Sequence, residues 1–153
     1  MTNESTLYFE IRDTENFIRI YVNGLNYPNA ELDWDRNWVN TLVLVKAGAF
    51  NGEFKADSMT TDFEIFKKEL KALYQNLDRE ATFKGIESQV TIRVQGDGIG
   101  HLKTECSLLD YAGTGNELKC ELEFDQTQLP ELIDQLEQIT IAFPTTGELK
   151  IKN

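Results

Sequence analysis

Runs in which apolar and polar residues alternate dominate the first third of the chain, and this period of two is typical of half-buried strands. Such runs predict strands over residues 7–11, 17–22, 38–47 and 49–56. The pair Asn23-Gly24 is a typical turn signal, so it predicts the end of the second strand and a polar loop over residues 23–37. The centre of the third strand is apolar on both faces, which predicts a central strand covered on both sides.

The period then changes from two to 3.6, which predicts a helix over about residues 61–77. One side of this helix is apolar and the other is charged. The apolar side consists of Phe63, Phe66, Leu70, Leu73, Tyr74 and Leu77. Thr61, with Glu64 three residues later, matches a capping box, in which a hydroxyl and a carboxylate satisfy backbone N–H groups at the helix start.

Alternating runs resume in the second half and predict strands over residues 81–84, 89–95, 101–109 and 117–124. The length of the glycine turn after the second of these decides the register. An odd loop pairs Val94 with Leu102 and keeps the apolar face continuous, whereas a two-residue Asp97-Gly98 turn would break it. The next hairpin then places Cys106 opposite Cys120 on the buried face.

A short helix is predicted over about residues 128–138, with Pro130 in its first turn, where the missing N–H costs nothing. Residues 139–143 could form a final strand. Consecutive strands with one inserted helix indicate the α+β class. We expect a single domain with eight or nine strands in a predominantly antiparallel, strongly curved sheet, the long helix packed on one face. No internal repeat is evident.

Negative charge is concentrated in one part of the chain. The formal net charge is −11, and nine carboxylates but only one basic side chain, Lys119, lie between Glu105 and Glu137. Nucleic acids and anionic membranes are bound through Lys and Arg, so this balance argues against both as direct partners. It favours a cationic protein partner.

Catalytic and metal chemistry have little support. His101 is the only histidine, which excludes a multi-histidine metal site within one chain. Cys106 lies five residues further along the same predicted strand, so the two side chains are expected on opposite faces. The glycine turn before His101 precedes a strand rather than a helix, which favours a hairpin over a phosphate loop. We expect no catalytic residue, metal or cofactor.

Two pairs of carboxylates remain as candidates for acid–base catalysis or for binding a hard metal ion. Asp33 with Asp35, and Glu121 with Glu123, are two residues apart and share a face of an extended chain. Nothing else marks them, and alternating acids on a strand are usually a solvated face.

The acidic segment supplies a hypothetical partner-binding surface. Its acids are expected on the outward face of the strand 117–124 and on the polar side of the last helix, and one patch results only if the helix docks suitably. Trp34 is added as an anchor because it lies in a polar loop beside carboxylates and Arg36. The candidate residues are Glu117, Glu121, Glu123, Asp125, Glu131, Asp134 and Trp34. The alternatives are that the acids serve solubility and that Trp34 packs within its loop.

A pattern of residues also resembles a known family. Its elements are Trp38, Gly48, Phe50, the sequence Thr61-Asp62-Phe63-Glu64, Ala81, Phe83, Glu87, Gly100-His101, and an acidic strand followed by a leucine-rich helix. Over about residues 31–143 the chain thereby resembles the WapI-type immunity proteins of bacterial contact-dependent toxin systems. The resemblance implies a small cytoplasmic protein that binds and blocks a cognate toxin domain, often a nuclease. It implies no shared catalytic set and transfers no contact residue.

These observations predict a non-catalytic, cytoplasmic immunity protein that neutralises a basic toxin domain through an acidic surface. The amino terminus has neither the basic start nor the apolar run of a signal peptide, in keeping with that location. Two other classes remain open, namely a structural or oligomer-forming protein and a small-molecule carrier that uses a curved sheet as a cup.

Overall fold

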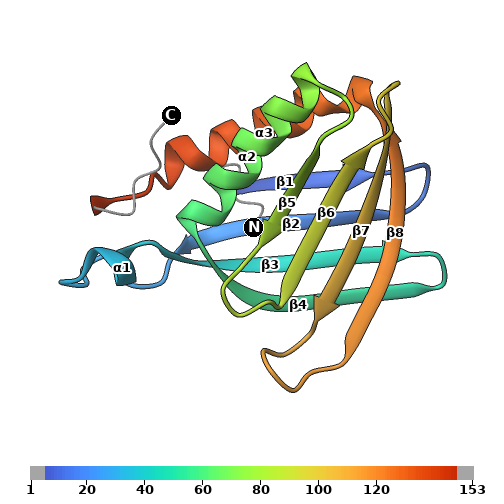
Figure 1. Ribbon diagram of the computed structural model, residues 1–153. Coiled ribbons are helices and arrows are strands. Elements are labelled where there is room, and N and C mark those ends of the chain that lie inside the picture. The colour runs from blue at the N-terminus through green and yellow to red at the C-terminus, as the bar shows by residue number, and fades with distance from the viewer. Residues whose placement is uncertain (1–5, 148–153) are drawn as a thin grey trace.

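Residues 6–147 form eight strands and three α-helices (Figure 1). The computed structural model describes residues 6–147. The elements are β1 (Leu7–Arg12), β2 (Phe17–Leu25), α1 (Asp33–Arg36), β3 (Trp38–Ala47), β4 (Phe50–Met59), α2 (Thr60–Gln75), β5 (Glu80–Lys84), β6 (Val90–Gly96), β7 (His101–Leu109), β8 (Glu117–Asp125), a 3-10 turn (Gln126–Gln128) and α3 (Leu129–Ala142). None of the helices within residues 6–147 is both long and apolar enough to cross a membrane.

The strands form two antiparallel sheets of four, in the orders β1-β2-β3-β4 and β5-β6-β7-β8. Their strand directions cross steeply, as Figure 1 shows. The structure therefore confirms the α+β class, the antiparallel pairing and both helices, and it divides the eight strands between two sheets. The first sheet ends at β4 because α2 begins directly after it and packs on β5, which opens the second sheet.

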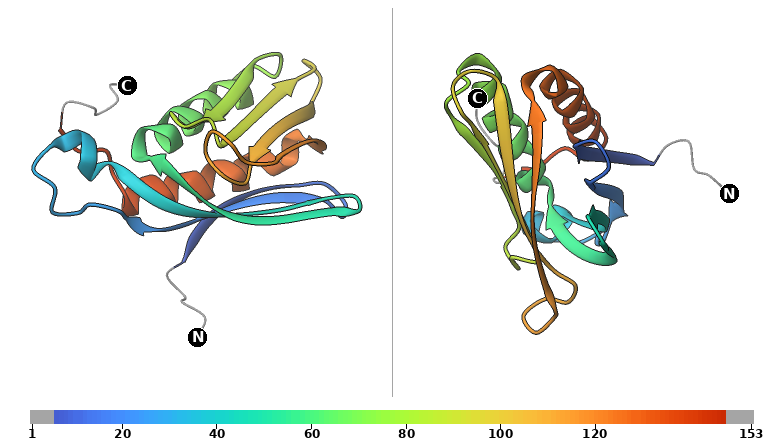
Figure 2. Two further views of the ribbon diagram at one scale, coloured as in Figure 1. Left: turned by 90° about the horizontal axis from the view of Figure 1, so that it is seen from below. Right: turned by 90° about the vertical axis from the view of Figure 1, so that its right-hand side faces the viewer.

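Apart from the short α1 between β2 and β3 and the 3-10 turn before α3, each half of the chain has the same order of elements, four strands followed by a helix. The repeat is one of topology, and it escapes sequence inspection because only the hydrophobic pattern recurs. Both helices lie on the same side of the first sheet as the second sheet does (Figure 2). The inward faces of the two sheets and the apolar sides of α2 and α3 enclose one core.

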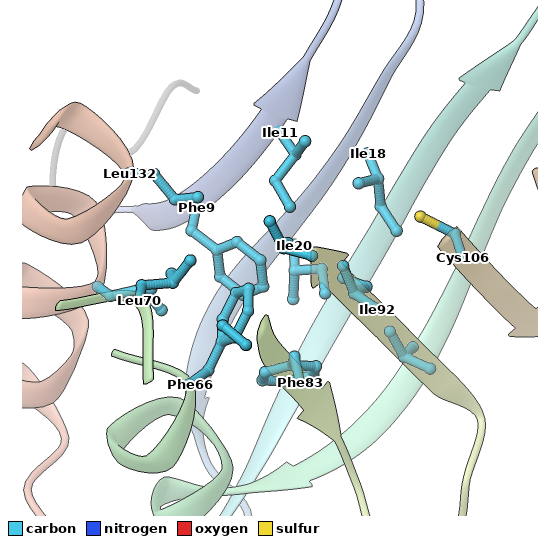
Figure 3. Close-up of a cluster of buried hydrophobic side chains, with 14 of the residues drawn as sticks. Phe9, Ile11, Ile18, Ile20, Phe66, Leu70, Phe83, Ile92, Cys106 and Leu132 are labelled. Atoms are coloured by element: carbon cyan, nitrogen blue, oxygen red, sulfur yellow. The ribbon is translucent and has the colours of Figure 1, made fainter. Parts of the chain in front are cut away.

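Aromatic rings form the centre of this core (Figure 3). Phe9 of β1, Phe63 and Phe66 of α2, and Phe83 of β5 are each at most 1% exposed. Phe83 lies 5.1–5.8 Å, between ring centroids, from the other three. Tilted and edge-to-face contacts of this kind add to the stabilisation that comes from burial alone. The four rings tie the two halves of the chain together.

The long helix begins at Thr60 and ends at Gln75, close to the predicted bounds. Its predicted capping box is wrong. The Asp62 carboxylate, rather than Glu64, reaches back and accepts a hydrogen bond from the Met59 N–H at 2.8 Å. The residue that precedes the helix is Met59 rather than Thr61, two residues earlier than predicted, and this moves the third helical position from Glu64 to Asp62.

Two predicted turns differ from the structure. Asn23-Gly24 does not end β2, because a bulge between Val22 and Gly24 lets the strand continue to Leu25. In the β6–β7 hairpin the parity is as predicted, but the register is two residues away, with Val94 opposite Thr104. The Asp97 carboxylate accepts hydrogen bonds from the N–H groups of Ile99 and His101, and these bonds hold a turn that is centred on Ile99 rather than on Gly98.

The last hairpin and the last helix give one confirmed prediction and one wrong prediction. Cys106 lies opposite Cys120, and both thiols are free. The predicted final strand over residues 139–143 is wrong, since α3 continues to Ala142. The helical spacing of Leu132, Leu136 and Ile139 explains this, because all three are buried and an uninterrupted apolar side keeps the segment helical.

Candidate partner-binding groove

A groove of about 1190 Å³ lies where the β1–β2 turn, the β6–β7 hairpin and the β8–α3 junction meet, at the upper right of Figure 1. Its charged lining residues are Arg12, Asp13, Asp97, His101, Lys103, Glu123, Asp125 and Glu131. Five carboxylates against two basic side chains give it a formal charge of −3 with His101 neutral. We call it the acidic groove.

The pairing register of β7 and β8 in the second sheet positions most of these charged side chains. Lys103 lies opposite Glu123, and His101 lies opposite Asp125, all four with exposed side chains on the outward face. Glu131 follows in the first turn of α3, where the helix dipole favours a negative charge. Three elements that follow one another in the chain, β7, β8 and α3, thus bring their charges to one place.

Local hydrogen bonds keep two carboxylates of the groove ionised. The hydroxyl of Thr127, then its N–H, donates to Asp125 and lowers the pKa of that carboxyl below its ordinary value. The backbone N–H of Ile99, and then that of His101, lowers the pKa of Asp97 in the same way. Both carboxylates are therefore anionic at neutral pH, and both are exposed.

The structure brings three of the predicted acids together and separates the others. Glu123, Asp125 and Glu131 line the acidic groove. Glu117 and Glu121 lie further along β8, and each is ion-paired, to Lys119 and to Lys103 respectively, at 3.5 Å. Their charge is thus partly balanced within the protein.

Two further predicted residues lie outside the groove. Asp134 is exposed one turn beyond Glu131 on α3, where residues three apart are neighbours on the helix surface. Trp34 is 45% exposed on α1, at the opposite end of the molecule in Figure 1. The seven candidates therefore do not form a single patch.

Ion pairing also decides which acids remain available to a partner. Glu137 of the acidic segment is bound by Lys67 at 3.1 Å and Lys71 at 3.6 Å, so α3 is partly neutralised by α2. The hydrogen bond from Lys67 lowers the pKa of Glu137. By contrast, none of the five carboxylates of the groove forms an ion pair with any residue in the range 6–147.

Sequence reasoning missed the residues that complete the groove. Arg12 and Asp13 come from the β1–β2 turn, and Asp97 and Lys103 come from the β6–β7 hairpin. Asp97 was visible only as part of a turn. Nothing in the sequence indicates that the first turn of the chain meets the start of the last helix, since that neighbourhood depends on how the two sheets cross.

Residues considered for other chemistry lie apart. His101 is exposed and Cys106 is buried, on opposite faces of β7. Asp33 is ion-paired with Arg36, and Asp35 lines a separate hollow of about 610 Å³. Phe83 is fully buried in the core, so it does not line a cavity of the kind that a small-molecule carrier needs.

Comparison with known proteins gives a family and a fold. A family model described as the immunity protein WapI-like family matches residues 8–144. No curated protein matches the chain. Among solved structures, the crystal structure of WHY1 from Arabidopsis thaliana is similar, with a TM-score of 0.50 and 10% identity, over 93% of this chain and 92% of that one. At that identity the likeness concerns the fold alone.

The family match extends from β1 to just beyond α3, so it includes both halves of the fold and every element of the acidic groove. It also confirms the resemblance that the sequence pattern indicated. The chain belongs to the immunity protein WapI-like family.

Proposed function

We propose that this protein neutralises a cognate toxin, without catalysis, by receiving a cationic surface of the toxin in the acidic groove. Membership of an immunity family supports a toxin protein as the partner. The charge and position of the groove support the cationic character of the surface that it receives.

The observation that carries the proposal is the group of three carboxylates, Glu123, Asp125 and Glu131, that lie in one groove and form no ion pair among residues 6–147. Carboxylates without a basic partner inside the protein can accept charge-assisted hydrogen bonds from Lys or Arg of another protein. Residues that are already paired, such as Glu121, would first have to give up a partner. The groove is therefore the most available anionic site on the surface formed by β8 and α3.

A nuclease is the kind of toxin that best matches this charge. Enzymes that act on RNA or DNA bind phosphates through basic residues, so their substrate sites are cationic. A preformed anionic groove would occupy such a site by replacing the phosphates. It would also accelerate association, by roughly 10- to 1000-fold at low salt. The proposed meeting place is the cytoplasm.

Co-purification with the product of the adjacent upstream gene tests the partnership, because an immunity gene is expected directly after its toxin gene. The groove is then tested with the double variant Glu123→Lys/Glu131→Lys. We expect slower association and a weaker dependence of the association rate on salt, measured by surface plasmon resonance between low and physiological salt.

The matched control is Glu31→Lys/Glu87→Lys, which makes the same change in net charge at two exposed positions outside the groove. It should keep most of the wild-type rate and salt dependence. Equal behaviour of the two double variants would show that net charge, rather than the groove, governs association. Retention of the wild-type rate by the groove variant would refute the assignment.

A further inference from the structure

The outward face of the first sheet carries an unexpected set of aromatic and aliphatic side chains. Three cross-strand rows span all four strands on this face, which we call the aromatic sheet face. The rows are Tyr8–Tyr21–Leu42–Lys55, Glu10–Arg19–Leu44–Glu53 and Arg12–Phe17–Lys46–Asn51. No helix or strand among residues 6–147 covers it, as the left view of Figure 2 shows. Outward faces of antiparallel sheets are normally polar, so this composition calls for an explanation.

The face is a preformed, rigid arrangement. The Arg19 guanidinium lies 5.0–5.6 Å from the ring centroids of Phe17, Tyr8 and Tyr21. Glu10 accepts hydrogen bonds from Arg19 at 2.5 Å and from Arg12 at 2.7 Å. Side chains held in this way lose little conformational entropy when a partner binds. Tyr and Arg are also the residues most enriched in binding hot spots.

We infer that the aromatic sheet face is a second docking surface for the toxin, which contacts it through an apolar patch bearing carboxylates. This inference rests on the proposed function. Four basic and two acidic side chains give the three rows a formal charge of +2, in a protein of net charge −11. The face is thus complementary to acidic groups, while the acidic groove is complementary to basic ones.

The two surfaces are continuous. Arg12 lines the acidic groove and also forms one corner of the aromatic sheet face. A single protein partner can therefore cover both, with its basic region in the groove and its acidic, apolar region on the sheet. The groove would then govern association, and the buried aromatic contacts would govern dissociation.

A second copy of this chain fits the face less well. A two-fold axis along the strands places Glu10 opposite Glu53 of the other copy. An axis across the strands places Glu10 opposite Glu10, and Arg19 opposite Arg19. Single-stranded nucleic acid also fits less well, because its bases would need ring faces that Arg19 already occupies.

The test uses the full chain and the purified toxin domain of the upstream gene product. Tyr8→Ala/Tyr21→Ala should raise the dissociation rate by at least about tenfold and change the association rate by less than about twofold. The groove variant Glu123→Lys/Glu131→Lys should instead lower the association rate and leave the dissociation rate nearly unchanged. Tyr74→Ala, at an exposed tyrosine on α2 outside both surfaces, is the control for loss of a tyrosine ring and should keep both rates.

A charge substitution at the edge of the aromatic sheet face keeps the inference testable if the tyrosine variant does not fold. Lys55→Glu should weaken binding at least about threefold, whereas Lys84→Glu, an exposed lysine on the second sheet, should not. A wild-type dissociation rate in a folded Tyr8→Ala/Tyr21→Ala protein overturns the inference and leaves the groove proposal standing. A wild-type protein that does not bind the toxin overturns both. A homodimer, or binding of a labelled single-stranded oligonucleotide, that the tyrosine substitutions abolish also overturns the inference.

Discussion

The two sheets share strand number, pairing and a following helix, yet their outward faces differ in chemistry. The face of β5–β8 is polar and joined by ion pairs, such as Arg93 with Glu80 at 2.8 Å and Lys103 with Glu121 at 3.5 Å. The face of β1–β4 places rings around Arg19 instead. The difference concerns the outward positions of the strands, which the core does not use and which are therefore free to serve function.

The fold requires only the inward positions of each strand to be apolar. In both sheets most of these positions are filled by buried aliphatic and aromatic residues, as Ile20 and Ile92 illustrate. The outward positions do not contribute to the core, so their composition is free to serve solubility or contact. The difference between a polar outward face on one sheet and an aromatic one on the other supports the inference that the first sheet provides a contact surface.

The largest expected effect concerns the inward faces, where the two halves should be equivalent. Phe9→Ala in the first half and Phe83→Ala in the second should each lower the free energy of unfolding by about 3–5 kcal/mol. Both rings are 0% exposed and lie 5.4 Å apart between centroids. Urea unfolding followed by circular dichroism measures the loss.

Phe50→Ala provides the control for ring truncation. Phe50 is 65% exposed at the β3–β4 turn, so its truncation should change the free energy of unfolding by less than about 0.5 kcal/mol. If either core variant were as mild as this control, the two halves would not share one core.

A smaller effect comes from the acids at the helix starts, which differ between the halves. Asp62 at the start of α2 is 9% exposed, and burial raises its pKa to about 6 from an ordinary 3.8, against the lowering effect of the Met59 N–H. The folded state therefore holds a proton that the unfolded state releases. The free energy of unfolding should fall as pH rises from about 4 to 6 and then level off, an effect of up to about 3 kcal/mol.

Asp62→Asn should remove this dependence and raise stability at pH 8, because the amide oxygen can still accept from Met59. Unfolding curves between pH 4 and 8 measure it. Asp78→Asn, at an exposed position after α2, should keep the wild-type dependence. If the free energy of unfolding of Asp62→Asn changed with pH in parallel with that of the wild type, the pH dependence would not come from Asp62.

The sequence predicts best those elements whose pattern is continuous. The bounds of β3 match the prediction, and α2 and β8 match within two residues, since periodicity and breakers fix them locally. The division into two sheets was not predictable, because β4 and β5 could have paired as well as any other neighbours. The cap at Asp62 was missed because Glu64 offers an equivalent carboxylate nearby.

The candidate site was predicted in part, for a related reason. Glu123, Asp125 and Glu131 were among the candidates, but the sequence left open whether they share one surface, because that depends on how α3 docks. Arg12 joins them only through the crossing of the two sheets. The aromatic sheet face was not recognised, because Tyr8, Phe17 and Tyr21 also suit a covered strand, and alternation alone does not show whether a face is covered.

The smallest expected effect tests the outward faces for stability rather than binding. Arg19→Ala should lower the free energy of unfolding by about 1 kcal/mol, because the side chain is 23% exposed, stacks on rings and bonds Glu10. Arg93→Ala should cost less than about 0.5 kcal/mol, because Arg93 and Glu80 are 45% and 49% exposed and such pairs contribute little. Thermal unfolding at low and high salt distinguishes the two, since the stacking on rings persists when salt screens the ion pairs. Equal losses would show that the rings around Arg19 add no rigidity to the face, and the case for a preformed contact surface would then rest on its composition alone.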